Sequence, residues 1–139
     1  MGVLVEYDVF MVTETLLLQE HEHLRHVRQY IHQHIDQPLT RDVLADIAGF
    51  SVPHFHRVFI GCIGESAASY IRRLRLQRAG FKLRCNRAVD IMDVALAAGY
   101  ATHAAFGKAF KKQYGLSPSE FRQLDCWSAT RILRQEKPT

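Results

Sequence analysis

The sequence lacks the features of a membrane or secreted protein. No apolar run in its 139 residues approaches the length of about 18 that a membrane-spanning helix needs. The N-terminus has no basic segment, and Glu6 and Asp8 interrupt its apolar residues, which is unlike a secretory signal. We therefore expect a globular protein of the cytoplasm that does not act on a membrane.

Cysteine is scarce as well, and the signatures of common enzymes are absent. Cys62, Cys85 and Cys126 are odd in number and far apart, so they form neither a disulfide framework nor a paired zinc motif. The sequence contains no GxSxG elbow, no P-loop and no GxGxxG after a strand. These absences predict a protein that is not an enzyme and that uses no cofactor and no metal.

Acidic residues are rare in the middle of the chain. Residues 51–122 carry twelve Arg or Lys against four Asp or Glu, a net charge of +8, whereas residues 1–50 carry a net charge of −5. The chain as a whole has a formal net charge of +4. Such a basic block indicates a polyanionic partner, although a solvated face that keeps the domain soluble would have the same composition.

Apolar residues recur at helical spacing over most of the chain, which predicts an all-α fold. Leu24, Val27, Ile31 and Ile35 define a helix that should end before Pro38. Further helices are expected to bury these apolar residues: Val43, Leu44, Ile47 and Ala48, then Phe55, Val58, Phe59 and Cys62, then Ala67, Tyr70, Ile71 and Leu74, and finally Phe106, Ala109, Phe110 and Tyr114. Another short helix is expected over 89–98, and a last one begins near Ser117.

The expected helix boundaries rest on caps and glycines. The residues expected at N-caps are Thr40, Ser51, Ser66 and Thr102, and the glycines expected to end helices are Gly49, Gly64, Gly99 and Gly115. Residues 1–20 alternate weakly, which predicts an extended arm or the remnant of a preceding segment. Residues 125–139 are expected to form a C-terminal extension.

Two segments of the chain resemble each other. Residues 43–50 match residues 93–100 at an offset of 50, and residues 55–59 then match residues 106–110 at an offset of 51. Each copy is a short helix, a Gly-aromatic turn and a second helix that begins at a cap, which is the sequence form of a helix-turn-helix. A purely structural pair of helix hairpins is the alternative, but solenoids usually have at least three repeats of shorter period.

The second copy and the residues after it resemble the signature of the AraC/XylS family of bacterial transcription regulators. The resemblance rests on Ala97-Ala98-Gly99-Tyr100, on residues 106–116, and on Ser117-Pro118-Ser119-Glu120-Phe121-Arg122. It covers residues 21–124 and implies two helix-turn-helix subdomains, at about 40–64 and 89–115, joined by a central helix at about 66–85. It also implies two recognition helices that enter adjacent major-groove segments of double-stranded DNA.

Candidate contact residues follow from the family pattern. The resemblance implies that Pro53, His56 and Arg57 face bases in the first recognition helix, and that His103, Ala104, Ala105 and Lys108 do so in the second. Arg57 is the strongest candidate, because arginine binds guanine O6 and N7 in a bidentate manner. Candidates for phosphate contact are Ser51, Thr102, Lys111 and Lys112.

The sequence also departs from the family pattern. Phe59-Ile60-Gly61-Cys62 stands where the family commonly has Phe-Lys-Lys, and two alanines occupy reading positions in the second helix. These departures favour the main alternative, a protein-interaction module that binds RNA polymerase or a partner regulator. A third hypothesis is a metal or ligand sensor that uses the histidines His21, His23, His26, His32 and His34. A stand-alone chain would bind DNA as a monomer.

Overall fold

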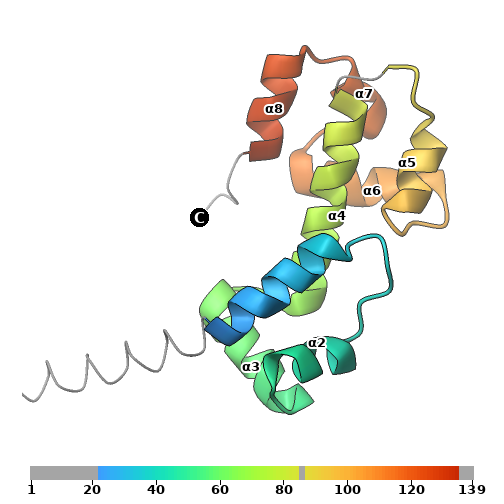
Figure 1. Ribbon diagram of the computed structural model, residues 1–139. Coiled ribbons are helices and arrows are strands. Elements are labelled where there is room, and N and C mark those ends of the chain that lie inside the picture. Colours follow the sequence, from blue (N-terminus) through green and yellow to red (C-terminus); the bar gives the residue numbers. More distant parts are fainter. Residues whose placement is uncertain (1–21, 85–86, 135–139) are drawn as a thin grey trace, which may run out of the picture. The chain divides into compact units, whose positions relative to one another are not determined.

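The computed structural model describes residues 22–84 and 87–134, and all regular structure in these ranges is helical (Figure 1). Residues 22–33 are helical. The helices that follow are α2 (Arg41–Ala48), α3 (Val52–Ile63), α4 (Ala67–Arg84), α5 (Ile91–Ala97), α6 (His103–Tyr114), α7 (Pro118–Arg122) and α8 (Cys126–Arg134). The expected all-α fold, with two helix-turn-helix segments joined by a central helix, is confirmed.

Most helices begin at the capping residues that the sequence predicts. The hydroxyl groups of Thr40, Ser51, Ser66 and Thr102 each accept a hydrogen bond from the backbone N–H three residues later, with N···O distances of 3.1–3.3 Å. Gly49, Gly64, Gly99 and Gly115 have φ between 75° and 92°, a left-handed conformation that glycine adopts without strain. These local signals set where each short helix starts and stops.

The chain divides into two compact units within α4, the first ending at Tyr70 and the second beginning at Ile71. In the first unit, Phe59 lies between two other aromatic rings. Its ring centroid is 5.6 Å from that of Phe55 and 5.6 Å from that of Tyr70. The buried apolar residues of this unit are Leu24, Val27, Ile31, Ile35, Leu44, Ala45, Ala48, Phe55, Val58, Phe59, Ala67 and Tyr70.

The second unit has a core of its own. Phe110 contacts Phe106 and Phe121 with centroid distances of 5.7 and 5.2 Å. The expected C-terminal extension is part of this core, since Ala129 and Leu133 of α8 are buried in it. The core residues are Leu76, Ala79, Leu83, Ile91, Val94, Ala95, Ala98, Phe106, Phe110, Phe121, Ala129 and Leu133.

Helix α4 changes its buried side along its length. Ala67, Tyr70, Ile71 and Leu74 are buried, as the sequence predicts, and Leu76, Ala79 and Leu83 are buried farther on. Leu76 follows Ala67 by about two and a half helical turns, so the two sets lie on nearly opposite faces of α4. The helix therefore has no single apolar stripe over its whole length.

Several details of the sequence prediction are wrong, and among them Ile47, Ala109 and Tyr114 are half-buried where burial was expected. Val43 is 40% exposed, and Ala45 takes the buried position of α2 instead. Cys62 is half-buried rather than in the core. The helix expected from residue 89 begins at Ile91, because Asp90 is its N-cap and accepts a hydrogen bond from Met92 N–H at 3.0 Å.

Some expectations fall outside the described residues. These are the extended arm at residues 1–20, His21, Cys85 and the last five residues of the chain. In the part of the chain that is described, no helix combines the length and the apolar character needed to cross a membrane.

Candidate nucleic-acid interface

The turn of the first helix-turn-helix is closed by backbone hydrogen bonds at the end of α2. Gly49 N–H donates to Asp46 O and Phe50 N–H donates to Ala45 O, both at 3.0 Å. Ala48, fully buried before the turn, has a side chain small enough for α2 and α3 to approach closely. This geometry fixes the direction in which α3 leaves the turn.

Helix α3 exposes a polar face next to its N-terminus. Pro53 and Arg57 are exposed, and His56 is half-exposed. His56 and Arg57 follow Pro53 by three and four positions, so each lies next to Pro53 on the helix surface. Ser51, the N-cap before them, is exposed as well. The buried side of α3 is formed by Phe55, Val58 and Phe59.

The second helix-turn-helix repeats the turn of the first. Gly99 N–H donates to Leu96 O at 3.0 Å, and Tyr100 N–H donates to Ala95 O at 2.9 Å. These are the same bonds as in the first copy, at the sequence offset of 50. The repeat seen in the sequence is therefore a repeat of backbone geometry, including the left-handed glycine and the aromatic residue after it.

Helix α6 exposes a longer basic face. His103, Ala104, Ala105 and Lys108 are exposed, and Lys111 and Lys112 extend the same face by one turn. Thr102 is exposed, and its hydroxyl accepts from Ala105 N–H at 3.1 Å. Phe106 and Phe110 anchor the opposite side of the helix in the core. All predicted contact residues of the second copy are thus exposed to solvent.

Arginines of α4 lie near both ends of α6, a feature the sequence left open. Arg72 and Arg75 are close enough to Tyr100 to act on its hydroxyl: burial raises the pKa of Tyr100 and these two positive charges oppose that rise. The pKa of Tyr114 is likewise raised by burial and lowered in part by Gln113 and Arg73. The run of arginines therefore adds positive charge beside the second recognition helix, where an anion would be favoured.

The described histidines of the first helix are not grouped as a set of metal ligands. Among the described residues, no group of three or more His, Cys, Asp or Glu side chains is placed to hold a metal ion. Three of them contact aromatic residues: the ring centroid of His23 lies 5.1 Å from that of Phe50, and His34 stacks on Tyr30 with a centroid distance of 4.0 Å. His32 Nε2 lies 3.1 Å from the Tyr70 hydroxyl.

Comparisons with known proteins agree with this geometry. A family of helix-turn-helix domains matches residues 44–124. The transcriptional regulator Rob of Salmonella typhimurium and the right origin-binding protein of Escherichia coli are each 36% identical over 106 residues, which are 76% of this chain and 36% of each relative. The chain thus spans about a third of their length. The regulatory protein SoxS of Escherichia coli is 36% identical over 67% of this chain and 86% of its own.

Solved structures share the fold. The C-terminal domain of AraT, a response regulator of Geobacillus stearothermophilus, has a TM-score of 0.65 and 30% identity over 73% of this chain and 84% of that domain. The DNA-binding domain of AdpA, solved in complex with a target DNA, has a TM-score of 0.65 and 24% identity over 82% of this chain and 97% of its own. From the matched domain, the SoxS-like sequence and the duplicated turn, we conclude that this chain belongs to the AraC/XylS family of helix-turn-helix transcription regulators.

Proposed function

We propose that this chain is a transcription regulator of the bacterial cytoplasm that binds double-stranded DNA in a sequence-specific way. In this proposal α3 and α6 are recognition helices that enter adjacent major-groove segments. The observation that carries the proposal is the duplicated turn: the same backbone bonds present α3 and α6, and each helix exposes its N-terminal face. A major groove admits an α-helix and displays a distinct donor and acceptor pattern for each base pair.

The first recognition helix would read bases mainly through Arg57. Its side chain is exposed, and a guanidinium matches the two acceptors of guanine. His56 lies beside it, with ring nitrogens that donate or accept a hydrogen bond. Pro53 offers apolar contact alone, because it has no backbone N–H. The Ser51 side chain, at the start of α3, would contact a phosphate.

The second recognition helix would combine weak base reading with strong phosphate contact. His103 and Lys108 supply polar groups, while Ala104 and Ala105 offer only apolar contact, for example with a thymine methyl group. Thr102, Lys111 and Lys112 would bind phosphates, and the arginines near Tyr100 and Tyr114 reinforce the positive potential there. Part of the specificity would then come from the shape of the DNA.

The organisation of the chain follows the same proposal. Residues 40–64 and 89–115 would each act as one helix-turn-helix, with residues 66–85 as the linking helix, and the chain would bind its site as a monomer. RNA polymerase is the second partner to test. The similarity to the regulators Rob and SoxS, and the fold shared with the DNA-bound AdpA domain, support a regulator that acts on DNA rather than a catalyst.

Two substitutions test the proposed division between base reading and phosphate contact. Arg57→Ala should weaken binding to a preferred duplex by about 1–3 kcal/mol and relax the preference at one base position. Lys111→Ala should weaken binding to all duplexes alike and reduce the slope of log affinity against log salt by about one unit. Both effects are measured by fluorescence anisotropy on the preferred duplex and on its single-base variants, over a range of salt concentrations.

Arg134→Ala in α8 is the matched control, since it removes one exposed positive charge outside both recognition helices. It should change neither the base preference nor the affinity by more than about twofold. An equal loss for Arg57→Ala on all duplexes would reject Arg57 as a base-reading residue.

A further inference from the structure

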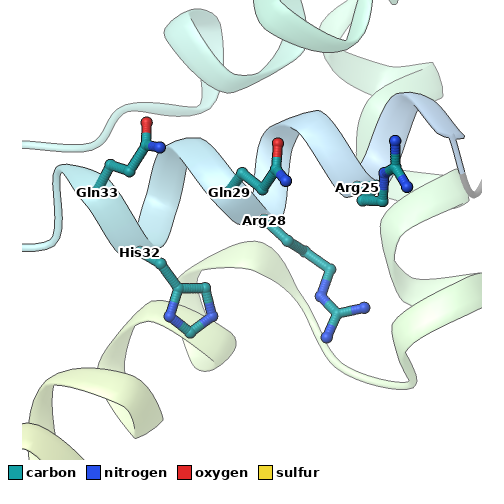
Figure 2. A pocket seen from close by; sticks show the side chains of 5 residues that line it. All are labelled: Arg25, Arg28, Gln29, His32 and Gln33. Atoms are coloured by element: carbon teal, nitrogen blue, oxygen red, sulfur yellow. The ribbon is translucent and has the colours of Figure 1, made fainter.

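A shallow, open groove of about 380 Å³ lies along the first helix, away from the predicted DNA contacts. It is lined by Arg25, Arg28, Gln29, His32 and Gln33 (Figure 2). All five belong to the helical residues 22–33 of the first unit. Neither the predicted DNA contacts nor the core uses these side chains as a group. In this otherwise acidic first third of the chain, the groove brings two arginines together.

The groove is organised by a buried tyrosine. The Tyr70 hydroxyl accepts a hydrogen bond from Arg28 Nε at 3.4 Å and lies 3.1 Å from His32 Nε2. Tyr70 is only 5% exposed, so its hydroxyl fixes the Arg28 and His32 side chains from the buried side of the groove. Arg25 sits one turn earlier on the helix, where its guanidinium forms an ion pair with Glu22 at 3.5 Å. Both members of that pair are largely exposed, so another carboxylate can replace Glu22 at little cost.

The groove lies on the far side of the core from the exposed face of α3. The ring of Phe59, on the buried side of α3, contacts the ring of Tyr70, and the hydroxyl of Tyr70 reaches the groove. Phe59 has no exposed surface, whereas Pro53 and Arg57 project from the other side of the same helix. A duplex held against Arg57 would therefore leave the groove open.

The shape and donors of the groove indicate its occupant. Its side chains are exposed, whereas a small-molecule pocket encloses most of its ligand. From Arg25 to Gln33 the groove runs about 12 Å along the helix, the length of about four residues of extended chain. Two guanidinium groups bind carboxylates, and the amides of Gln29 and Gln33 both donate to and accept from a peptide backbone.

We propose that this groove is a docking site for an extended acidic segment of a partner protein, and that it stays available while α3 is bound to DNA. The carboxylates of the segment would pair with Arg25 and Arg28, and its backbone would bond to the glutamine amides. The first half of the proposal stands without DNA binding, and the second half rests on the proposed function.

The test uses the full chain and a fluorescent peptide of eight glutamates, with a peptide of eight glutamines as the uncharged control. Backbone amide shifts in NMR spectra should change at residues 25–33 and not along α6. Arg25→Gln should weaken peptide binding about fivefold, the upper end for an exposed ion pair, and Arg28→Gln should do the same. Arg25 is largely exposed and pairs with Glu22 on its own helix, so this variant separates binding from folding.

Arg134→Gln is the control for loss of charge alone and should reduce peptide affinity less than twofold. Glu22→Gln should raise it, because Arg25 loses its competing carboxylate. The proposal is overturned if the shift changes map to α3 or α6, if Arg25→Gln binds the peptide like the unaltered chain, or if inorganic phosphate alone binds the groove and the peptide does not.

A second arm repeats the peptide titration with a saturating duplex present. Unchanged peptide affinity supports simultaneous occupancy, and loss of peptide binding overturns that half of the proposal. Absence of any duplex binding would instead reject the proposed function, while the peptide arm without DNA still decides whether the groove binds an acidic segment.

Discussion

At the scale of single residues, short-range hydrogen bonds at the N-caps fix where the helices begin. Ser117 and Glu120 form a capping box in α7: Glu120 N–H donates to Ser117 Oγ at 3.1 Å, and Ser117 N–H donates to Glu120 Oε1 at 3.2 Å. Hydrogen bonds to its carboxyl from the backbone and the side chain of Ser117 hold the pKa of Glu120 below its usual value of 4.5. Hydrogen bonds from Ser128 lower the pKa of Asp125 in the same way.

The capping box gives a prediction about acid stability. A carboxyl with a lowered pKa stabilises the folded state above its unfolded pKa, and that contribution is lost as the pH falls through its folded pKa. The free energy of unfolding should therefore fall from about pH 5 downward, and less steeply in Glu120→Gln, which keeps the capping hydrogen bond without the charge. Urea denaturation at several pH values measures both slopes. Identical slopes for the two proteins would contradict the prediction.

Caps could be predicted from the sequence, whereas contacts between distant residues could not. Thr40, Ser51 and Thr102 were predictable as caps because a cap is a local interaction within four residues. The exposure of Val43 and the contacts of Tyr70 with Arg28 and His32 depend on tertiary packing, and no local pattern carries them.

At the scale of helices, two glycines inside helices should respond in opposite ways to alanine. A Cβ at Gly61 of α3 would meet no atom within 4 Å, so Gly61→Ala should raise the free energy of unfolding by about 0.5–1 kcal/mol through helix propensity. A Cβ at Gly80 of α4 would overlap the buried side chain of Leu133 in α8. Overpacking of this kind costs about 1–3 kcal/mol, which cancels or exceeds the same propensity gain.

Thermal and urea denaturation of the two alanine variants test this contrast directly. The Gly61→Ala variant should melt at a higher temperature than the unaltered chain. The Gly80→Ala variant should melt at a lower temperature than the Gly61→Ala variant. Equal stabilisation by both substitutions would mean that α8 does not pack on α4 as described.

The sequence repeat predicted the two turns but not how all the helices pack. The copies at 43–50 and 93–100 predicted both turns, because a left-handed glycine and a small residue before it are local requirements. The sequence did not predict that α8 packs in the core. Leu133 of α8 lies against Gly80 of α4, about 50 residues earlier in the chain, and such a distant contact leaves no local pattern. Helix α4 likewise has no single stripe to detect, because its buried face changes side at Leu76.

At the scale of the whole molecule, charge and duplication point to the same function. The net charge of +8 over residues 51–122 covers both recognition helices and the arginines of α4. Binding to DNA should then weaken steeply with salt, with a slope near −0.9 per phosphate contacted. The first third of the chain is acidic instead, and we propose that the groove with Arg25 and Arg28 binds a different, acidic partner.

The measurement that tests the central claim most directly is selection of bound sequences from a random duplex pool at about physiological salt. Nonspecific phosphate binding is weak under this condition, so enrichment reports base reading. The account predicts two enriched boxes about one helical turn apart, one for α3 and one for α6. A pool that stays random after repeated selection would contradict the claim that this chain reads DNA sequence.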